Sequence, residues 1–158
     1  MKVTVLVGSK SDLEAAEKVR ARLTEFEVPC EVHVASAHRT PEKVDRLVAD
    51  PATEVFVAMA GLSAALPGAV AARTLRPVIG VPLQGRGLGL DSLLSVVQMP
   101  PGVPVAAVGL DNTENAALLA VHLLALKHPE LEERLRRYRA RWREEPTTPA
   151  PPTTPGRA

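Results

Sequence analysis

The chain has 158 residues, which fits one domain with one hydrophobic core. A formal net charge of +1, one Trp, one Tyr and two Phe argue against a protein that binds nucleic acid through a basic field or through base stacking. The apolar runs all fall well short of the roughly 20 residues that span a bilayer, so we expect no membrane partner either.

Residues 1–10 are too short and too strand-like for a secretory signal peptide, so we expect a cytoplasmic protein. The single cysteine, Cys30, cannot form an internal disulfide, and no other thiol is available to complete a metal site. We expect a buried structural thiol at this position and no metal in the protein.

Five apolar runs predict the strands of a parallel sheet, because continuous runs are typical of strands that are buried on both faces. The segments between them have helical spacing, clearest in the stripe of Ala16, Val19, Leu23 and Phe26. This alternation predicts an α/β fold, a three-layer doubly wound sandwich with helices on both faces of the sheet. The predicted strands cover residues 3–7, 30–34, 55–59, 77–81 and 104–108.

The C-terminal third of the chain suggests an oligomer. Residues 115–126 are apolar nearly all round, so a helix there needs cover on more than one side, which a subunit interface would supply. An extended helix after Pro129 then has an apolar stripe with which it could reach across to a neighbouring subunit. Its members are Leu131, Leu135, Tyr138 and Trp142.

Residues 146–158 consist mainly of Pro, Thr and Ala with no periodicity, and we expect a disordered tail. The predicted single domain therefore covers residues 1–145.

The loop after the first strand combines a glycine with hydroxyl and carboxylate side chains. Gly8 allows a tight turn, and the helix that follows presents free N–H groups to an anion. Ser9 and Ser11 add hydroxyl donors, while Asp12 can accept from a sugar hydroxyl. The alternative is that Ser11 or Asp12 serves only as the N-cap of this helix.

The loop after the second strand, residues 36–41, carries an imidazole and a guanidinium. His38 can give and take a proton near neutral pH, and Arg39 offers a rigid fork for phosphate or carboxylate. Together they predict proton transfer on an anionic substrate. The alternative is that Ser36 or Thr40 caps the next helix while His38 and Arg39 are solvated.

Two later loops are rich in small residues. Residues 61–68 allow a backbone to approach a ligand closely, although tight packing of a helix on the sheet also selects small residues. Residues 82–90 contain three glycines, with Gln84 and Arg86 as the polar side chains, which suggests a mobile or closely approached loop. In a parallel sheet, all these loops meet at one edge.

Taken in order, GSKSD, SAHRTP, LPG, GVP, VQMPPGVPV and NAALLA resemble the N5-carboxyaminoimidazole ribonucleotide mutases of bacterial purine biosynthesis, the PurE family, over residues 3–142. The resemblance implies a flavodoxin-like sandwich assembled as a homo-octamer, with no metal and no organic cofactor. It implies a ribonucleotide substrate whose carbamate carboxyl moves to ring carbon 4. It also implies pairing with the ATP-dependent enzyme that makes this carbamate.

The resemblance also assigns residues. His38 matches the family's catalytic histidine, and in the implied mechanism it first assists loss of carbon dioxide from the carbamate and then takes the proton displaced from ring carbon 4. The positions that match substrate-binding residues, or line the same pocket, are Ser9, Ser11, Asp12, Ser36, Arg39, Gly61, Ser63 and Leu66.

Two departures from the family pattern keep an alternative open. Ala65 stands where many mutases have a histidine before LPG. The absence of this histidine resembles the related class that carboxylates aminoimidazole ribonucleotide directly with carbon dioxide. Residues 85–89 also lack the serine-bearing sequence of many mutases. Arg39 and VQMPPGVPV favour the mutase, with the direct carboxylase as the alternative.

Two further alternatives use the same scaffold. A signalling receiver needs several acidic residues at the sheet edge, and the first loop offers only Asp12. A relative acting on another aromatic acid nucleotide would follow if Ala65 and residues 85–89 reshape the pocket.

Overall fold

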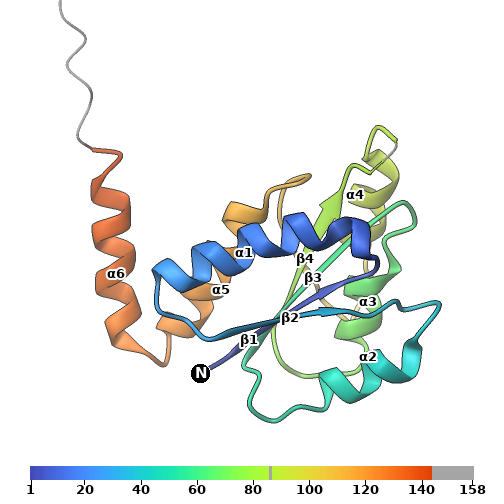
Figure 1. Cartoon of the computed structure of the whole chain (residues 1–158), viewed down its shortest axis with the longest axis horizontal. Coiled ribbons are helices and arrows are strands. Elements are labelled where there is room, and N and C mark those ends of the chain that lie inside the picture. Colours follow the sequence, from blue (N-terminus) through green and yellow to red (C-terminus); the bar gives the residue numbers. More distant parts are fainter. Residues whose placement is uncertain (86, 144–158) are drawn as a thin grey trace, which may run out of the picture.

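The computed structural model describes residues 1–85 and 87–143 and contains one five-stranded parallel sheet of order β2-β1-β3-β4-β5 (Figure 1). The predicted α/β sandwich is confirmed. Arg86 and the tail at 146–158, which we expected to be disordered, lie outside the described residues. The strands are β1 (Val3–Val7), β2 (Cys30–Val34), β3 (Val55–Gly61), β4 (Val78–Leu83) and β5 (Ala106–Ala107).

Burial along the strands follows their place in the sheet. The central strands β1, β3 and β4 are buried almost throughout, as their unbroken apolar runs predict. The edge strand β2 is only half-buried. At the other edge, β5 has two residues instead of the five predicted, and Pro104, which has no N–H to donate to a ladder, lies before it.

Helices cover both faces of the sheet (Figure 1). One face packs against α1 and α5, with α6 beside them, and the inward side chains of β1 on this face include Val5. The other face packs against α2, α3 and α4, and Leu6 of β1 points into that second core. The helices are α1 (Leu13–Glu25), α2 (Pro41–Val48), α3 (Ala65–Ala71), α4 (Leu90–Val97), α5 (Thr113–Ala125) and α6 (Pro129–Ala140), with a 3-10 turn, η1 (Lys10–Asp12), before α1.

The predicted stripe on α1 is confirmed, because all four of its members are buried. The C-terminal helices differ from expectation. Leu131 and Leu135 of α6 are buried in the same core as the inner face of α5, so the chain itself supplies much of the cover that α5 needs. In the predicted stripe on α6, Leu131, Leu135 and Tyr138 pack within their own subunit. The fourth member, Trp142, is 76% exposed.

Polar contacts hold α6 in this position. The Tyr138 hydroxyl donates to Glu114 Oε1 at 2.7 Å, and the guanidinium of Arg22 lies 5.2 Å from the centre of the Tyr138 ring. The rings of Phe26 and Tyr138 are 5.6 Å apart. These contacts join α1, α5 and α6 into one layer.

Cys30 is half-buried rather than fully buried, because it begins the edge strand β2. Burial raises the pKa of its thiol to about 11, so the thiol stays protonated at neutral pH. No helix in the described part of the chain combines the length and apolarity needed to cross a membrane.

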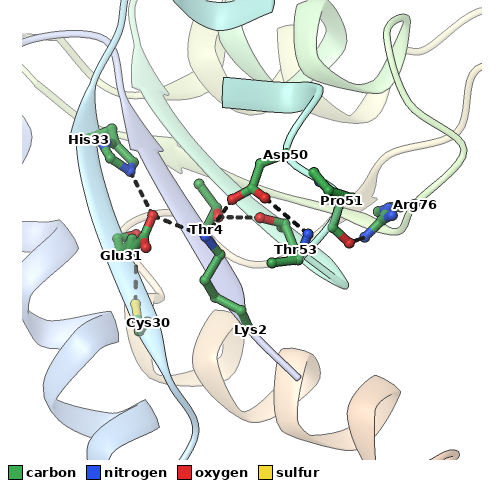
Figure 2. A network of polar contacts seen from close by, with 10 residues as sticks. Lys2, Thr4, Cys30, Glu31, His33, Asp50, Pro51, Thr53 and Arg76 are labelled. Atoms are coloured by element: carbon green, nitrogen blue, oxygen red, sulfur yellow. Dashed lines mark hydrogen bonds and ion pairs between the residues drawn. The ribbon is translucent and has the colours of Figure 1, made fainter. Parts of the chain in front are cut away.

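A polar network ties together the end of the sheet at which β1 and β3 begin. Figure 2 shows Lys2 between two carboxylates, paired with Asp50 and 3.1 Å from Glu31. Beside them the buried hydroxyls of Thr4 and Thr53 are 2.7 Å apart. This network lies at the opposite end of the strands from the loops predicted to form the site.

The network predicts a pH dependence of stability. The hydrogen bonds from Lys2 lower the pKa of both Asp50 and Glu31 in the folded chain. The resulting stabilisation is therefore present above the unfolded carboxyl pKa values of about 4 and is lost as pH falls through the lower folded values. We expect Lys2→Met to destabilise the protein at pH 7 and to flatten the dependence of the unfolding free energy on pH in acid.

Urea unfolding at a series of pH values measures this slope, with Lys10→Met at an exposed lysine as the control. An unchanged slope in Lys2→Met would show that the network does not stabilise the sheet.

Candidate functional site

A cleft of about 500 Å³ opens at the edge of the sheet where the strands end. Its walls are the loops that follow β1, β2 and β3, and Gly85 reaches it from the loop after β4. All nine residues proposed from the sequence line this one cleft. They are Ser9, Ser11, Asp12, Ser36, His38, Arg39, Gly61, Ser63 and Leu66.

A second hollow of about 540 Å³ lies beside the start of β4 and is a weaker candidate. Its two arginines are already engaged, since Arg73 pairs with Asp45 and Arg76 donates to the carbonyl of Pro51 at 3.0 Å. Among the described residues that line this hollow there is no imidazole and no carboxylate. The first cleft holds the imidazole, hydroxyls and carboxylate that chemistry requires.

The first loop keeps its polar side chains available. Ser9 Oγ accepts from the Ser11 N–H at 3.4 Å, and Ser11 Oγ donates to Asp12 Oδ1 at 2.9 Å. Asp12 occupies the N-cap position of α1 but makes no side-chain capping bond. Asp12 therefore takes the predicted N-cap position with its carboxylate free of capping, and the side-chain capping bond at the turn before α1 is made by Ser9.

The second loop is closed by its own hydroxyls. Thr40 Oγ1 accepts from the Ser36 N–H at 2.9 Å and donates to the Ser36 carbonyl at 3.3 Å. Ser36 Oγ accepts from the backbone N–H of Arg39 at 3.2 Å. Thr40 precedes α2 without a side-chain capping bond, so it fixes the loop that carries His38 instead of capping the helix.

Arg39 joins this loop to the first one. Its Nη2 donates to the carbonyl of Gly8 at 2.7 Å, and its Nε donates to Ser36 Oγ at 3.4 Å. The guanidinium is exposed and keeps its other donors for a ligand. His38 is also exposed at the cleft, so its ring is accessible to a bound molecule.

The third loop supplies an apolar wall. The N–H of Ala64 donates to the Gly61 carbonyl at 3.0 Å, which closes a tight turn before α3. A Cβ at Gly61 would lie 3.2 Å from the carbonyl oxygen of Leu83, so the small residue is needed for packing as well as for access to the cleft. Leu66 is buried and forms the floor, whereas Ser63 is exposed.

Sequence reasoning missed two residues that position these loops. Thr40 closes the second loop, and Asp111 Oδ1 accepts from the Gln84 N–H at 3.1 Å, which attaches the loop after β4 to the chain after β5. Asp111 has a left-handed backbone, φ 54°. No pattern in the sequence marks either contact, because each depends on side-chain bonds to backbone groups. Within residues 1–85 and 87–143 no cluster of three His, Cys, Asp or Glu could hold a metal.

The family model described as AIR carboxylase matches residues 2–145. The chain belongs to this family. One relative, the N5-carboxyaminoimidazole ribonucleotide mutase of Methanocaldococcus jannaschii, is 52% identical to this chain over 142 residues. The match covers 90% of each chain. The mutase of that name from Mycobacterium tuberculosis is 51% identical over 138 residues, covering 85% of this chain and 79% of the relative.

Solved structures agree with the predicted flavodoxin-like sandwich. The crystal structure of a substituted form of Treponema denticola PurE2 superposes with a TM-score of 0.79 at 28% identity, covering 88% of this chain and 89% of the other. Treponema denticola PurE gives a TM-score of 0.76 with the same identity and coverage. The resemblance to the PurE family stated from the sequence is confirmed.

Proposed function

We propose that this AIR carboxylase family member converts N5-carboxyaminoimidazole ribonucleotide into 4-carboxy-5-aminoimidazole ribonucleotide. The observation that carries the proposal is the meeting of His38, Arg39, Ser9 and Asp12 in one cleft at the sheet edge. Relatives at about half identity bear the mutase name, which favours the mutase over the direct carboxylase. Residues 1–145 would act as one catalytic domain.

The anionic and polar ends of the substrate fit the loops after β1 and β2. Arg39 is the proposed phosphate ligand, since its guanidinium is exposed and already held at the cleft by two hydrogen bonds. Ser9 and the N–H groups at the start of η1 and α1 can also donate to an anion, and Asp12 can accept from the ribose hydroxyls. Ser11, Ser36, Gly61, Ser63 and Leu66 would complete the pocket.

His38 is the proposed proton carrier. As an imidazolium it gives its proton to the carbamate nitrogen while the carbon–nitrogen bond breaks, which leaves an amine and carbon dioxide. Ring carbon 4 then attacks the carbon dioxide, and neutral His38 takes the proton that this carbon loses. One imidazole passes through both protonation states, so the reaction consumes no proton.

Thr40 is expected to matter because it holds the loop that carries His38. Thr40→Val removes the hydroxyl that bonds both backbone groups of Ser36, and we expect a loss of about 1–2 kcal/mol of unfolding free energy. Displacement of the imidazole should also lower kcat by about tenfold or more. Thr40→Ser keeps the hydroxyl and should therefore keep most of the unfolding free energy and most of the kcat of the unmodified protein. Equal kinetics in Thr40→Val and the unmodified protein would remove Thr40 from the account.

We also propose a homo-octamer. An apolar strip made of Leu88, Leu90, Leu94 and Val97 is exposed on and before α4, with Leu88 89% and Leu90 59% exposed. A contiguous strip of this kind is typical of a surface that another subunit covers. We therefore expect the subunit contact at α4, in place of the α5 and α6 surfaces indicated by the sequence.

Leu94→Arg tests this contact, because a charge on the strip would be buried without a partner. Light scattering should give the mass of eight chains for the unmodified protein and a smaller assembly for the variant. A monomeric unmodified protein would contradict the octamer.

The proposed partner in metabolism is the ATP-dependent enzyme that makes the carbamate. Both reactions belong in the cytoplasm, since a phosphorylated nucleotide does not cross a bilayer unaided.

The direct test of the function is turnover of the carbamate substrate at low bicarbonate. Product should form at a rate that does not depend on bicarbonate. Product that appears only when bicarbonate is raised would identify a direct carboxylase instead, which takes its carboxyl group from dissolved carbon dioxide.

A further inference from the structure

Leu62 is an unusual residue in this cleft. Its side chain is 63% exposed, and its backbone has a left-handed φ of 54°. Left-handed backbone disfavours a residue with a Cβ, and exposure of a leucine to water forfeits its burial. The left-handed backbone destabilises the folded chain, and the exposed side chain contributes no burial that would offset it. A glycine at this position would avoid the backbone strain and would expose no apolar side chain. Folding alone therefore does not explain why the residue is a leucine.

The rest of the cleft indicates what Leu62 faces. The loops after β1 and β2 supply hydroxyls, a carboxylate, an imidazole and a guanidinium, whereas the residues at and after the end of β3 are mainly apolar, three alanines and two leucines among them. Among the described residues that line the cleft, Leu62 is the one large apolar side chain that is exposed. The turn from Gly61 to Ala64 is closed by a hydrogen bond, which fixes the backbone from which this side chain projects.

We propose that Leu62 is the residue that retains carbon dioxide in the cleft. It would form the apolar wall against the imidazole ring of the substrate and the released gas, on the side opposite the polar loops. The inference rests on the proposed function, because it assigns a role within the carboxyl transfer. Leu62 carries no proton and acts by excluding water and closing the exit.

The chemistry has a branch at which such a wall matters. After the carbon–nitrogen bond breaks and the nitrogen receives its proton, the cleft holds an amine and carbon dioxide. Attack by ring carbon 4 forms the new carbon–carbon bond and returns a proton to His38. If carbon dioxide escapes, water hydrates it to bicarbonate and a proton, and aminoimidazole ribonucleotide is released. The ratio of the two products therefore measures retention.

Leu62→Gly is the informative variant, because it should change stability and retention in opposite directions. Removing the side chain and the left-handed strain should raise the melting temperature. Loss of one apolar contact should lower the ratio of 4-carboxy product to released aminoimidazole ribonucleotide by about tenfold. Leu62→Met, with an apolar side chain of similar volume, should restore most of the ratio.

The control is Glu27→Gly, which relieves a left-handed φ of 54° before the start of β2, at the end of the strand opposite the cleft. It should leave the product ratio unchanged. Both products are counted by chromatography, after subtraction of the carbamate lost without protein.

Each outcome has one meaning. If the unmodified protein makes no 4-carboxy product, the proposed function fails. If it does and Leu62→Gly keeps the same ratio, the role of Leu62 fails alone. A Leu62→Gly variant that is less stable, or that has a smaller mass in solution, would show that Leu62 packs against another subunit and would also overturn the inference.

Discussion

Replacement of His38 by asparagine is expected to reduce turnover of the carbamate by about 100-fold or more, because His38 is the one imidazole among the described residues that line the cleft. Asparagine keeps a polar side chain of similar size, so the loop that Thr40 closes should keep its fold. Steady-state assays at several pH values measure the effect, and circular dichroism checks the fold.

The matched control is His33→Asn. His33 lies on β2 within the polar network, 3.2 Å from Glu31 and away from the cleft. It should retain near-normal turnover. If His38→Asn also turned over at a near-normal rate, the proton would have to travel by another route, and His38 would lose its catalytic role.

Replacement of Phe56 by alanine is expected to lower the free energy of unfolding by about 3–5 kcal/mol. Phe56 is fully buried near the start of β3, in the core shared with α2, α3 and α4, so its loss leaves a cavity in that core. This is a large share of the roughly 5–15 kcal/mol that stabilises a typical domain. Urea unfolding should show it as a lower midpoint.

Leu75→Ala provides the comparison, because Leu75 is fully exposed and should change stability by less than about 0.5 kcal/mol. If Phe56→Ala lost no more than Leu75→Ala, the core on this face of the sheet would not be packed as described.

The sequence predicted most of the layers because the strands stand out as short apolar runs. The runs at β1 and β2 end where the pattern indicated, and the buried α1 stripe followed from its spacing. Edge effects were harder to predict. The shortness of β5 and the half-burial of Cys30 depend on position in the sheet, which periodicity does not encode.

The candidate site was predictable as a place, because parallel strands bring their following loops to one edge. The contacts that hold the loops were not. Thr40 was a candidate helix cap but bonds Ser36 instead, and Asp111 bonds a loop that is 27 positions away in the sequence. The conformation of Leu62 was equally hidden, since nothing in a sequence predicts a leucine with positive φ.

The C-terminal helices show that an apolar pattern does not identify what covers it. A helix that is apolar nearly all round needs cover, but the pattern does not say whether the cover is another subunit or the next helix. Here Leu131 and Leu135 of α6 supply it within the chain. The exposed strip on α4 is consequently the better indication of a subunit contact.

The central claim is that one carboxyl group stays in the cleft of His38 and Arg39 while it moves from nitrogen to carbon. Substrate labelled with ¹³C in its carbamate, turned over in excess unlabelled bicarbonate, tests this directly by mass spectrometry of the product. The account predicts that most of the 4-carboxy product keeps the label. Product that contains only unlabelled carboxyl would show that the carboxyl comes from solution and would contradict it.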